Sequence, residues 1–249
     1  MPHIYRAYCP SCGITGNRAV IDQPERVHHI RDVLRMKPKD TLLIFDEAGK
    51  EYDCIIESCG SNAIVLTVTG RNERFESGSL LAVACALPKK AAMDDIVDSL
   101  TQLGVDRIIP MITERTVVRP DKASLARKFQ RWQKISLSSS QQCGRTRLPL
   151  LENVCSLPDV LSMTSGYGTK LIPTLEGRRR HVGEFAGLAR DPGKLVFLIG
   201  PEGDFSPCEV EEAVRCGFIP VSLGRLTLRV DTAAVAVSAL FHLCADNFR

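Results

Sequence analysis

The stretch Leu195–Ala239, LVFLIGPEGDFSPCEVEEAVRCGFIPVSLGRLTLRVDTAAVAVSA, carries most of the information about the fold. It begins with a continuous apolar run, Leu195–Ile199, that is ended by glycine and proline. Such a run is typical of a buried strand in a parallel sheet. The next segment, GPEGD at residues 200–204, is a turn whose two glycines allow the backbone to approach a ligand closely.

A helix and a second strand follow this turn. Ser206–Glu209 combines an N-cap serine, a proline at the first helical position and a glutamate three residues after the cap, which is a strong helix start. The helix is expected to place Val210, Ala213 and Val214 on one face and to end near Gly217.

The second strand, at residues 219–223, ends at Gly224 and precedes a loop at 225–231 and an apolar helix at about 232–243. Two strand ends, each followed by a glycine loop and a helix, are expected to converge on one place. Ligands bind at the carboxyl ends of the strands in open α/β sheets. Two ordinary strand-to-helix turns would fit the same spacing, so that interpretation stays open.

The wording of two motifs resembles a known family. IGPEGDFS at residues 199–206 and LGRLTLRVDTA at 223–233 resemble the paired signature of the SPOUT-class RNA methyltransferases, and more narrowly the family that methylates N3 of a uridine in small-subunit (16S) ribosomal RNA. That family typically has GPEGGFS and LGxxILRxETA. This chain has Asp204 for the second glycine, Thr227 for isoleucine and Asp231 for glutamate.

The resemblance implies an α/β fold in which a small PUA-like β-barrel domain precedes a SPOUT domain with a trefoil-knotted, mostly parallel sheet. We expect the barrel at residues 1–72 and the methyltransferase domain at 77–249. The knot is expected from the resemblance alone, because knots are nearly absent from proteins in general. The class builds its site between two chains, so the resemblance also implies a homodimer.

Composition favours a soluble, cytoplasmic protein. No apolar run approaches the roughly 18 residues of a membrane span, and the N-terminus lacks the apolar core of a signal peptide. The ten cysteines are scattered and are interpreted as cytosolic thiols. Cys9 and Cys12 have half of a zinc-knuckle spacing, so a metal there remains an alternative to a plain loop, although no metal is expected.

The N-terminal part predicts a small β domain, with strand-like runs at 41–46, 52–57 and 63–69. Before them, Ile30, Val33 and Leu34 fall on one helical face. His28 and His29 are interpreted as surface residues, with metal ligation or base chemistry as the alternative. The segment 28–40 resembles the family's RNA-holding domain, which implies phosphate contacts by Arg31, Arg35 and Lys37.

The middle of the chain alternates strands and helices, which predicts a parallel sheet. After a polar linker at 71–79 come a strand at 80–87, an amphipathic helix at 92–103, a strand at 107–112 and, later, a strand at 170–175. The family resemblance weakens at two places. The family has glycine and arginine where this chain has Ala91 and Ala92, and it has lysine and glutamate where this chain has Ser99 and Gln102.

Basic residues gather between Arg115 and Arg147, where nine Lys or Arg residues accompany a single acid. This pattern indicates a surface for phosphates, and a solvated helix face is the alternative. Trp132, in a helix expected at 122–141, is interpreted as a core residue rather than as a stacking platform for a base. A match to the family's Q-x-x-R-x-x-x-P pattern at 142–149 implies an RNA contact by Arg145.

The resemblance implies S-adenosyl-L-methionine as the cofactor. The residues expected to cradle it are glycines, apolar residues and backbone donors of the two motifs: Leu198, Ile199, Gly200, Pro201, Glu202, Gly203, Leu223, Gly224, Arg225, Leu226, Leu228 and Thr232. Methylation at N3 requires loss of a weakly acidic proton, which calls for a general base or for a cation near O2 or O4. Glu202 and Asp231 are the candidate bases, and Arg229 is the candidate cation.

Alternatives stay open at each position. Glu202 would also cap a loop, Asp231 would N-cap the last helix, and Arg229 would pair with either acid. Two other functions fit less well: an RNA-binding protein of the same fold with lost or altered methyltransferase activity, and a metal-assisted phosphate enzyme that uses Glu202, Asp204 and Asp231. No histidine accompanies these acids and no phosphate-loop pattern is present, which argues against the second.

Overall fold

The computed structural model describes residues 5–73, 80–89, 92–190 and 193–244. These residues form two compact units. The described part of the smaller unit is residues 5–73 with 137–148, and that of the larger unit is 80–89, 92–136, 149–190 and 193–244. The domain boundaries at 1–72 and 77–249 stay predictions, and no sequence feature indicated that residues 137–148 cluster with the smaller unit.

The smaller unit is a curled, PUA-like six-stranded sheet. Its strands lie in the order β1 (Arg6–Tyr8), β4 (Thr41–Phe45), β5 (Lys50–Cys59), β6 (Ile64–Glu73), β3 (Arg18–Ile21) and β2 (Ile14–Thr15). Only the pairing of β1 with β4 is parallel among these described strands. The three predicted strands correspond to β4, β5 and β6, whereas β1 to β3 were too short to be recognised.

The predicted linker is shorter than expected, because β6 continues to Glu73. Residues 71–73 therefore belong to a strand, and residues 74–79 lie outside the described part.

Ala91 and Ala92 are two positions at which the sequence departs from the family pattern. Ala91 lies outside the described residues. Ala92 begins a helix.

A change of helix type alters the predicted apolar face near residue 30. Helix α1 (Pro24–His28) passes into a π-helical turn at His29–Val33, in which the Leu34 N–H donates to the His29 carbonyl at 2.9 Å. This wider turn rotates the side chains that follow it. Ile30 is buried as expected, but Val33 is 56% exposed, so the predicted helical face is wrong at that residue.

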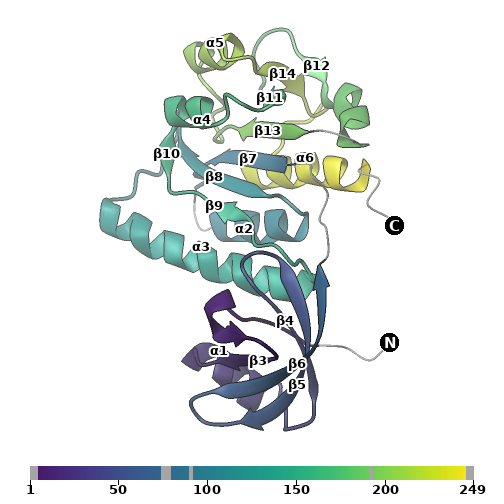
Figure 1. Ribbon diagram of the computed structural model, residues 1–249. Helices are drawn as coiled ribbons and strands as arrows, with labels where there is room; N and C mark the ends of the chain where they lie inside the picture. The colour runs from purple at the N-terminus through teal and green to yellow at the C-terminus, as the bar shows by residue number, and fades with distance from the viewer. Residues whose placement is uncertain (1–4, 74–79, 90–91, 191–192, 245–249) are drawn as a thin grey trace. The chain divides into compact units, whose positions relative to one another are not determined.

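The larger unit contains a sheet in which every pairing of its described strands is parallel. The order is β10 (Cys155–Ser156), β8 (Arg107–Ile112), β7 (Leu80–Ala86), β13 (Lys194–Ile199), β11 (Thr169–Pro173), β14 (Ile219–Ser222) and β12 (Arg180–His181), with β9 (Leu150–Leu151) also paired to β8 (Figure 1). The predicted parallel sheet is thus confirmed, while the trefoil knot stays a prediction.

Helices cover both faces of this sheet. Successive strand residues point to opposite faces, so that Phe197 lies in one apolar core and Leu198 in the other. The first core includes α2 (Ala92–Gln102), α6 (Val230–Cys244) and Trp132 of α3 (Lys122–Cys143); the second includes α4 (Leu157–Met163) and α5 (Pro207–Arg215). Burial on both faces explains why the strands are continuous apolar runs.

The predictions for the last two helices hold except for one buried face and one helix start. Ser206 caps α5 and forms a capping box with Glu209, as the sequence predicted. Val214 of this helix is nevertheless 45% exposed rather than part of the buried face. The last helix begins at Val230, earlier than expected, so Asp231 lies in its first turn and not at its N-cap. No described helix is long and apolar enough to cross a membrane.

Trp132 is 1% exposed, and its indole N–H donates to the Asp94 carboxylate at 3.0 Å, which confirms its interpretation as a core residue. We expect Trp132→Phe to lower the free energy of unfolding by about 2 kcal/mol, since the hydrogen bond to a charged group is lost. Circular dichroism in urea measures this, because the substitution removes the only tryptophan.

Arg131 provides the matched control, since its guanidinium bonds the same carboxylate at 2.7 Å from a side chain that is 68% exposed. Exposed ion pairs contribute about 0–1 kcal/mol, so Arg131→Gln should cost less than Trp132→Phe. An equal or larger cost for Arg131→Gln would contradict this account.

Candidate ligand-binding site

One pocket of the larger unit lies where three neighbouring parallel strands end. The loops after β11, β13 and β14 line it together with the first turns of α6. Its volume is about 620 Å³, which includes space open to solvent. The wall consists of Pro173, Thr174, Leu175, Arg179, Ile199, Gly200, Pro201, Glu202, Asp204, Ser222, Leu223, Gly224, Leu226, Thr227, Leu228, Val230 and Ala233.

The turn after β13 is tightly packed at its base. A Cβ atom on Gly200 would lie 3.0 Å from the ring of Phe205, which is completely buried. Only a residue without a side chain fits there without a shift of the ring. The Arg115 guanidinium holds the other side of the turn, since it donates to the carbonyls of Gly203 and Phe205 at 2.9 and 3.2 Å.

Gly224 turns the chain at the end of β14. Its φ of +125° lies in a region that residues with side chains rarely adopt. The Ser222 hydroxyl accepts from the Gly224 N–H at 3.2 Å and donates to its carbonyl at 3.0 Å, which closes the turn. Leu226, two residues on, is 80% exposed at the rim of the pocket.

Most of the residues predicted for cofactor binding lie together on the pocket wall. These are Ile199, Gly200, Pro201, Glu202, Leu223, Gly224, Leu226 and Leu228. Four others do not line it. Leu198 is completely buried in the sheet core, Gly203 faces the Arg115 side chain, and Arg225 and Thr232 are exposed residues outside the wall. The assignment of roles to all twelve stays a prediction.

The three candidate catalytic residues have different surroundings. Glu202 lines the pocket, but its Oε1 accepts from the Lys89 backbone N–H at 2.8 Å, which is the loop-capping role kept as an alternative. Arg229 is exposed, immediately before α6. Burial raises the pKa of the Cys85 thiol, and the negative charges of Asp231 and Glu202 raise it further. Through its bond to the Lys89 N–H, Glu202 lies near the carboxyl end of β7.

A third wall of the pocket escaped the sequence analysis. Pro173 ends β11, Thr174 and Leu175 follow it, and Arg179 lies a short distance along the chain. The sequence did predict a strand here, at residues 170–175. What it lacked was any sign that β11 lies between β13 and β14, because these strands are separated along the chain and adjacent only in the sheet.

The residues predicted to bind RNA occupy the smaller unit. Arg35 and Lys37 are exposed, and Arg35 has a left-handed φ of +54°. Arg31 is half-buried, and its Nε and Nη2 donate to the two oxygens of Asp32, each at 2.8 Å. Arg145 is only 8% exposed. RNA contacts by all four stay predictions, and the burial of Arg145 argues against a direct role for that residue.

Neither candidate metal-binding feature gains support. The sequence interpretation of His28 overlooked Asp32, whose Oδ2 lies 2.7 Å from the imidazole Nδ1. Burial raises the pKa of the Cys9 thiol to about 11. In the part of the chain that the structure describes, no three His, Cys, Asp or Glu residues are grouped so that they would hold a metal ion.

The Arg31 hydrogen bond, aided by one from His28, lowers the pKa of Asp32 from 3.8 to about 2. Arg31→Gln should therefore raise this pKa toward 3.8, which a carbon-detected NMR titration measures. The pKa of Asp32 is lower in the folded protein than in the unfolded chain, so the ionised carboxylate stabilises the folded state. This stabilisation is complete above the unfolded-state pKa and is lost as the pH falls through about 2. Arg18→Gln, which removes an exposed arginine of β3, serves as the control and should leave the Asp32 titration unchanged.

Comparison with known proteins identifies the family. The RNA methyltransferase domain model matches residues 76–242, and the RNA methyltransferase PUA domain model matches residues 21–69. The first match covers more than half of the chain, so this protein belongs to the RNA methyltransferase family.

Relatives match over nearly their whole length. The ribosomal RNA small subunit methyltransferase E of Bacillus subtilis is 28% identical over 239 residues, which is 94% of this chain and 90% of the relative. The protein of the same name from Mycobacterium tuberculosis is 28% identical over 230 residues, with 91% and 87% covered.

Solved structures agree in fold. The ribosomal RNA small subunit methyltransferase E of Neisseria gonorrhoeae bound to S-adenosyl methionine matches with a TM-score of 0.86 and 26% identity, covering 99% of this chain and 100% of the other. A Legionella pneumophila structure described as a methyltransferase in complex with the cofactor SAM matches with a TM-score of 0.87 and 28% identity, covering 98% of each chain.

Proposed function

We propose that this chain transfers a methyl group from S-adenosyl-L-methionine to N3 of a uridine in small-subunit ribosomal RNA. The observation that carries the proposal is the pocket in which both motif loops meet, at residues 199–202 and 222–228. Relatives and solved neighbours with the same fold are named as ribosomal RNA methyltransferases or hold this cofactor. The choice of uridine N3 rests on the wording of the two motifs.

The residues of the pocket fit this cofactor. Ile199, Leu223 and Leu228 supply apolar contacts for a flat adenine ring, and the glycine turns bring backbone N–H and C=O groups to the wall. Arg179 and Glu202 offer one charge of each sign to the zwitterionic amino-acid end of the molecule. When bound, the cofactor supplies an activated methyl group on a sulfonium, so that the protein has mainly to position the acceptor.

The remaining task is to manage the proton and charge of the uridine. Arg229 is exposed beside the pocket segment and would stabilise negative charge on O2 or O4. Asp231, in the first turn of α6, is the better candidate for the base, because one oxygen of Glu202 already accepts from the Lys89 N–H. Glu202 then holds the turn in place.

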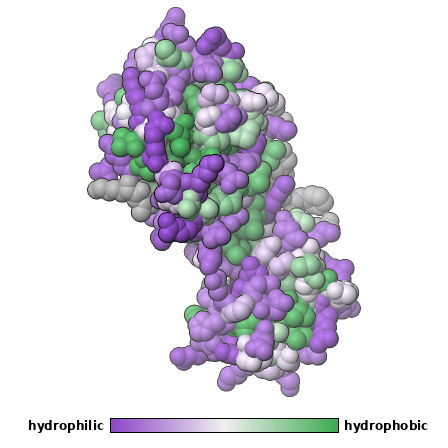
Figure 2. Space-filling model, turned by 90° about the vertical axis from the view of Figure 1, so that its left-hand side faces the viewer, coloured by the Kyte–Doolittle hydropathy of each residue, from purple (hydrophilic) through white to green (hydrophobic). Residues whose placement is uncertain are grey.

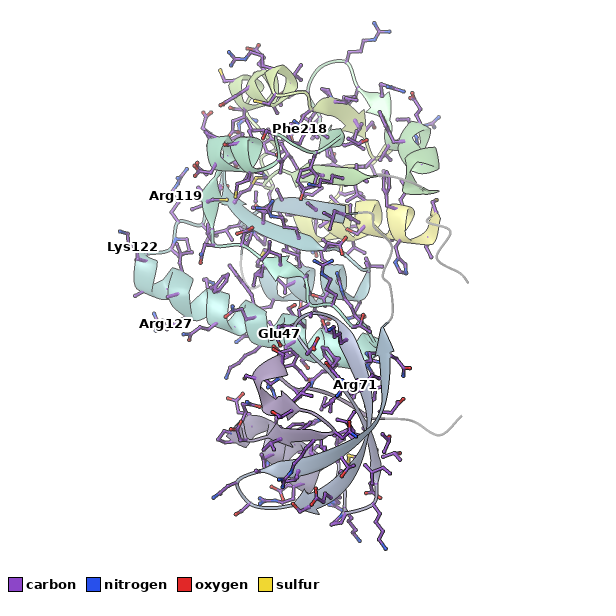
Figure 3. The ribbon with its side chains drawn as sticks, in the orientation of Figure 1. Glu47, Arg71, Arg119, Lys122, Arg127 and Phe218 are labelled. Carbon is purple, nitrogen blue, oxygen red and sulfur yellow. The ribbon has the colours of Figure 1, made fainter. Side chains whose placement is uncertain are left out.

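The RNA would contact both units. In the smaller unit, Arg35 and Lys37 are exposed cations. In the larger unit, Lys122 and Arg127 are exposed cations on the first half of α3 (Figure 3). Such cations suit a phosphate backbone, whose contacts weaken with salt.

We further infer a homodimer that acts in the cytoplasm, where ribosomal RNA is modified. Leu226 and Leu175 are exposed apolar residues at the rim of the pocket, where a second chain would cover them. Figure 2 shows that hydrophobic and hydrophilic side chains are interspersed on one face of the larger unit. A partner at the rim would also close the site against water, which favours methyl transfer.

The first test is cofactor binding by calorimetry. The wild-type protein should bind S-adenosylmethionine, and Gly224→Val should abolish binding, because valine is strained at a φ of +125° and fills space at the pocket wall. Gly166→Ala is the control, since a Cβ there meets nothing within 4 Å. Absence of binding by the wild-type protein would end the proposal.

The second test addresses the chemistry. Arg229→Gln should lower kcat for methylation of small-subunit RNA about 100-fold, since a charge that stabilises the transition state is lost. Mass spectrometry of RNA digests should identify the product as N3-methyluridine. Affinity for S-adenosylhomocysteine should be unchanged in this variant. Arg178→Gln removes a nearby exposed charge outside the pocket wall and should retain activity; equal activity of Arg229→Gln and the wild type would rule out the role of Arg229.

A further inference from the structure

Asp204 connects two of the loops that form the pocket. Its Oδ2 accepts from the Thr174 hydroxyl at 2.9 Å and from the Leu175 N–H at 2.6 Å, and its Oδ1 accepts from the Phe205 N–H at 2.8 Å. Thr174 and Leu175 follow β11, whereas Asp204 belongs to the turn after β13. One carboxylate therefore holds together two segments separated by about thirty residues of chain.

The backbone at Asp204 is shaped for this connection. Its φ is +60°, in the left-handed region that favours glycine, and aspartate is among the few other residues that tolerate it. A glycine would adopt this conformation more easily but would offer no acceptor. The three hydrogen bonds of the Asp204 side chain thus offset the cost of its left-handed backbone conformation.

Thr174 extends the connection to the third loop. It is 6% exposed, its N–H donates to the Val221 carbonyl of β14 at 3.2 Å, and its carbonyl accepts from Arg179 Nη1 at 3.0 Å. Thr174, Arg179 and Asp204 all line the pocket. The Asp204–Thr174 hydrogen bond consequently lies between the three strand ends that form the wall.

We infer that Asp204 is a positioning residue for the adenosyl ligand: it holds the loop after β11 against the turn after β13, in the geometry that binds the cofactor. The inference rests on the proposed function, because the pocket is taken to bind S-adenosylmethionine. Loops held in the binding conformation before the ligand arrives need no further ordering on binding, which strengthens affinity. Asp204 thereby acts on cofactor affinity and not on methyl transfer itself.

The test compares variants by calorimetric titration with S-adenosylhomocysteine. Asp204→Gly keeps the left-handed backbone and removes all three hydrogen bonds, so affinity should fall about tenfold, equivalent to about 1.4 kcal/mol. Asp204→Asn tolerates the same backbone and retains one carbonyl acceptor, so its affinity should lie between those of Asp204→Gly and the wild type. In methylation assays, KM for the cofactor should rise in both variants while kcat at saturating cofactor stays within about twofold.

Thr174→Val keeps the shape of the partner and removes only its hydroxyl. It should weaken binding in the same direction, and the double variant with Asp204→Gly should lose less affinity than the sum of the two, because both changes remove the same hydrogen bond. Thr164→Val is the matched control: Thr164 is completely buried in the same unit, and its hydroxyl bonds the Val160 carbonyl away from the pocket.

The outcomes separate this inference from the proposed function. Weaker binding by Asp204→Gly and Thr174→Val, with wild-type melting curves, supports the positioning role. Wild-type affinity in both variants overturns it and leaves the proposed function intact. If Asp204→Gly does not fold, Thr174→Val decides alone. If the wild-type protein does not bind S-adenosylhomocysteine, the proposed function fails and the inference fails with it.

Discussion

The parallel pairing of β13 with β7 on one side and β11 on the other is the constraint on which the site depends. Parallel strands end at the same edge of a sheet, so the turn after β13 lies beside the loop after β11, and β14 adds a third strand end next to it. Antiparallel pairing would send neighbouring loops to opposite edges. The glycine motifs would then be separated, and no pocket would form between them.

Strand order alone does not determine the shape of the loops. Hydrogen bonds to three segments distant along the chain also hold the turn after β13 in place. Asp204 bonds the loop after β11, Arg115 bonds two carbonyls of the turn, and Glu202 bonds the backbone at Lys89. Both acids of the GPEGD motif, Glu202 and Asp204, thus hold loops in place through hydrogen bonds. In the proposed reaction, Asp231 is therefore favoured over Glu202 as the base, and Arg229 is the residue proposed to stabilise negative charge on the uridine.

Local signals in the sequence predicted much of this architecture. The apolar runs gave β7, β8 and β13, the Ser206 capping box gave the start of α5, and the two motifs gave eight residues of the pocket wall. Such features depend on neighbouring residues only. A small β domain and a parallel sheet were likewise indicated by repeated short strands and by alternation of strands with helices, whereas the PUA-like type came from the family resemblance.

The errors arose where tertiary structure decides. The Thr174 wall depends on a bond to Asp204 thirty residues away, and no local pattern reveals it. The π-helical turn rotates Val33 into solvent. Basic residues illustrate the same limit: Arg115, Arg119 and Arg131 all bond groups within the larger unit, so charge along the chain overstates the charge available to a ligand.

The most direct measurement is hydrogen exchange by mass spectrometry with and without S-adenosylhomocysteine. The account predicts that the ligand slows amide exchange in three separate segments together, at residues 173–175, 199–204 and 222–230, and leaves β2 and β3 of the smaller unit unchanged. Protection of only one of these segments, or protection confined to another part of the protein, would contradict the claim that three strand ends form one cofactor site.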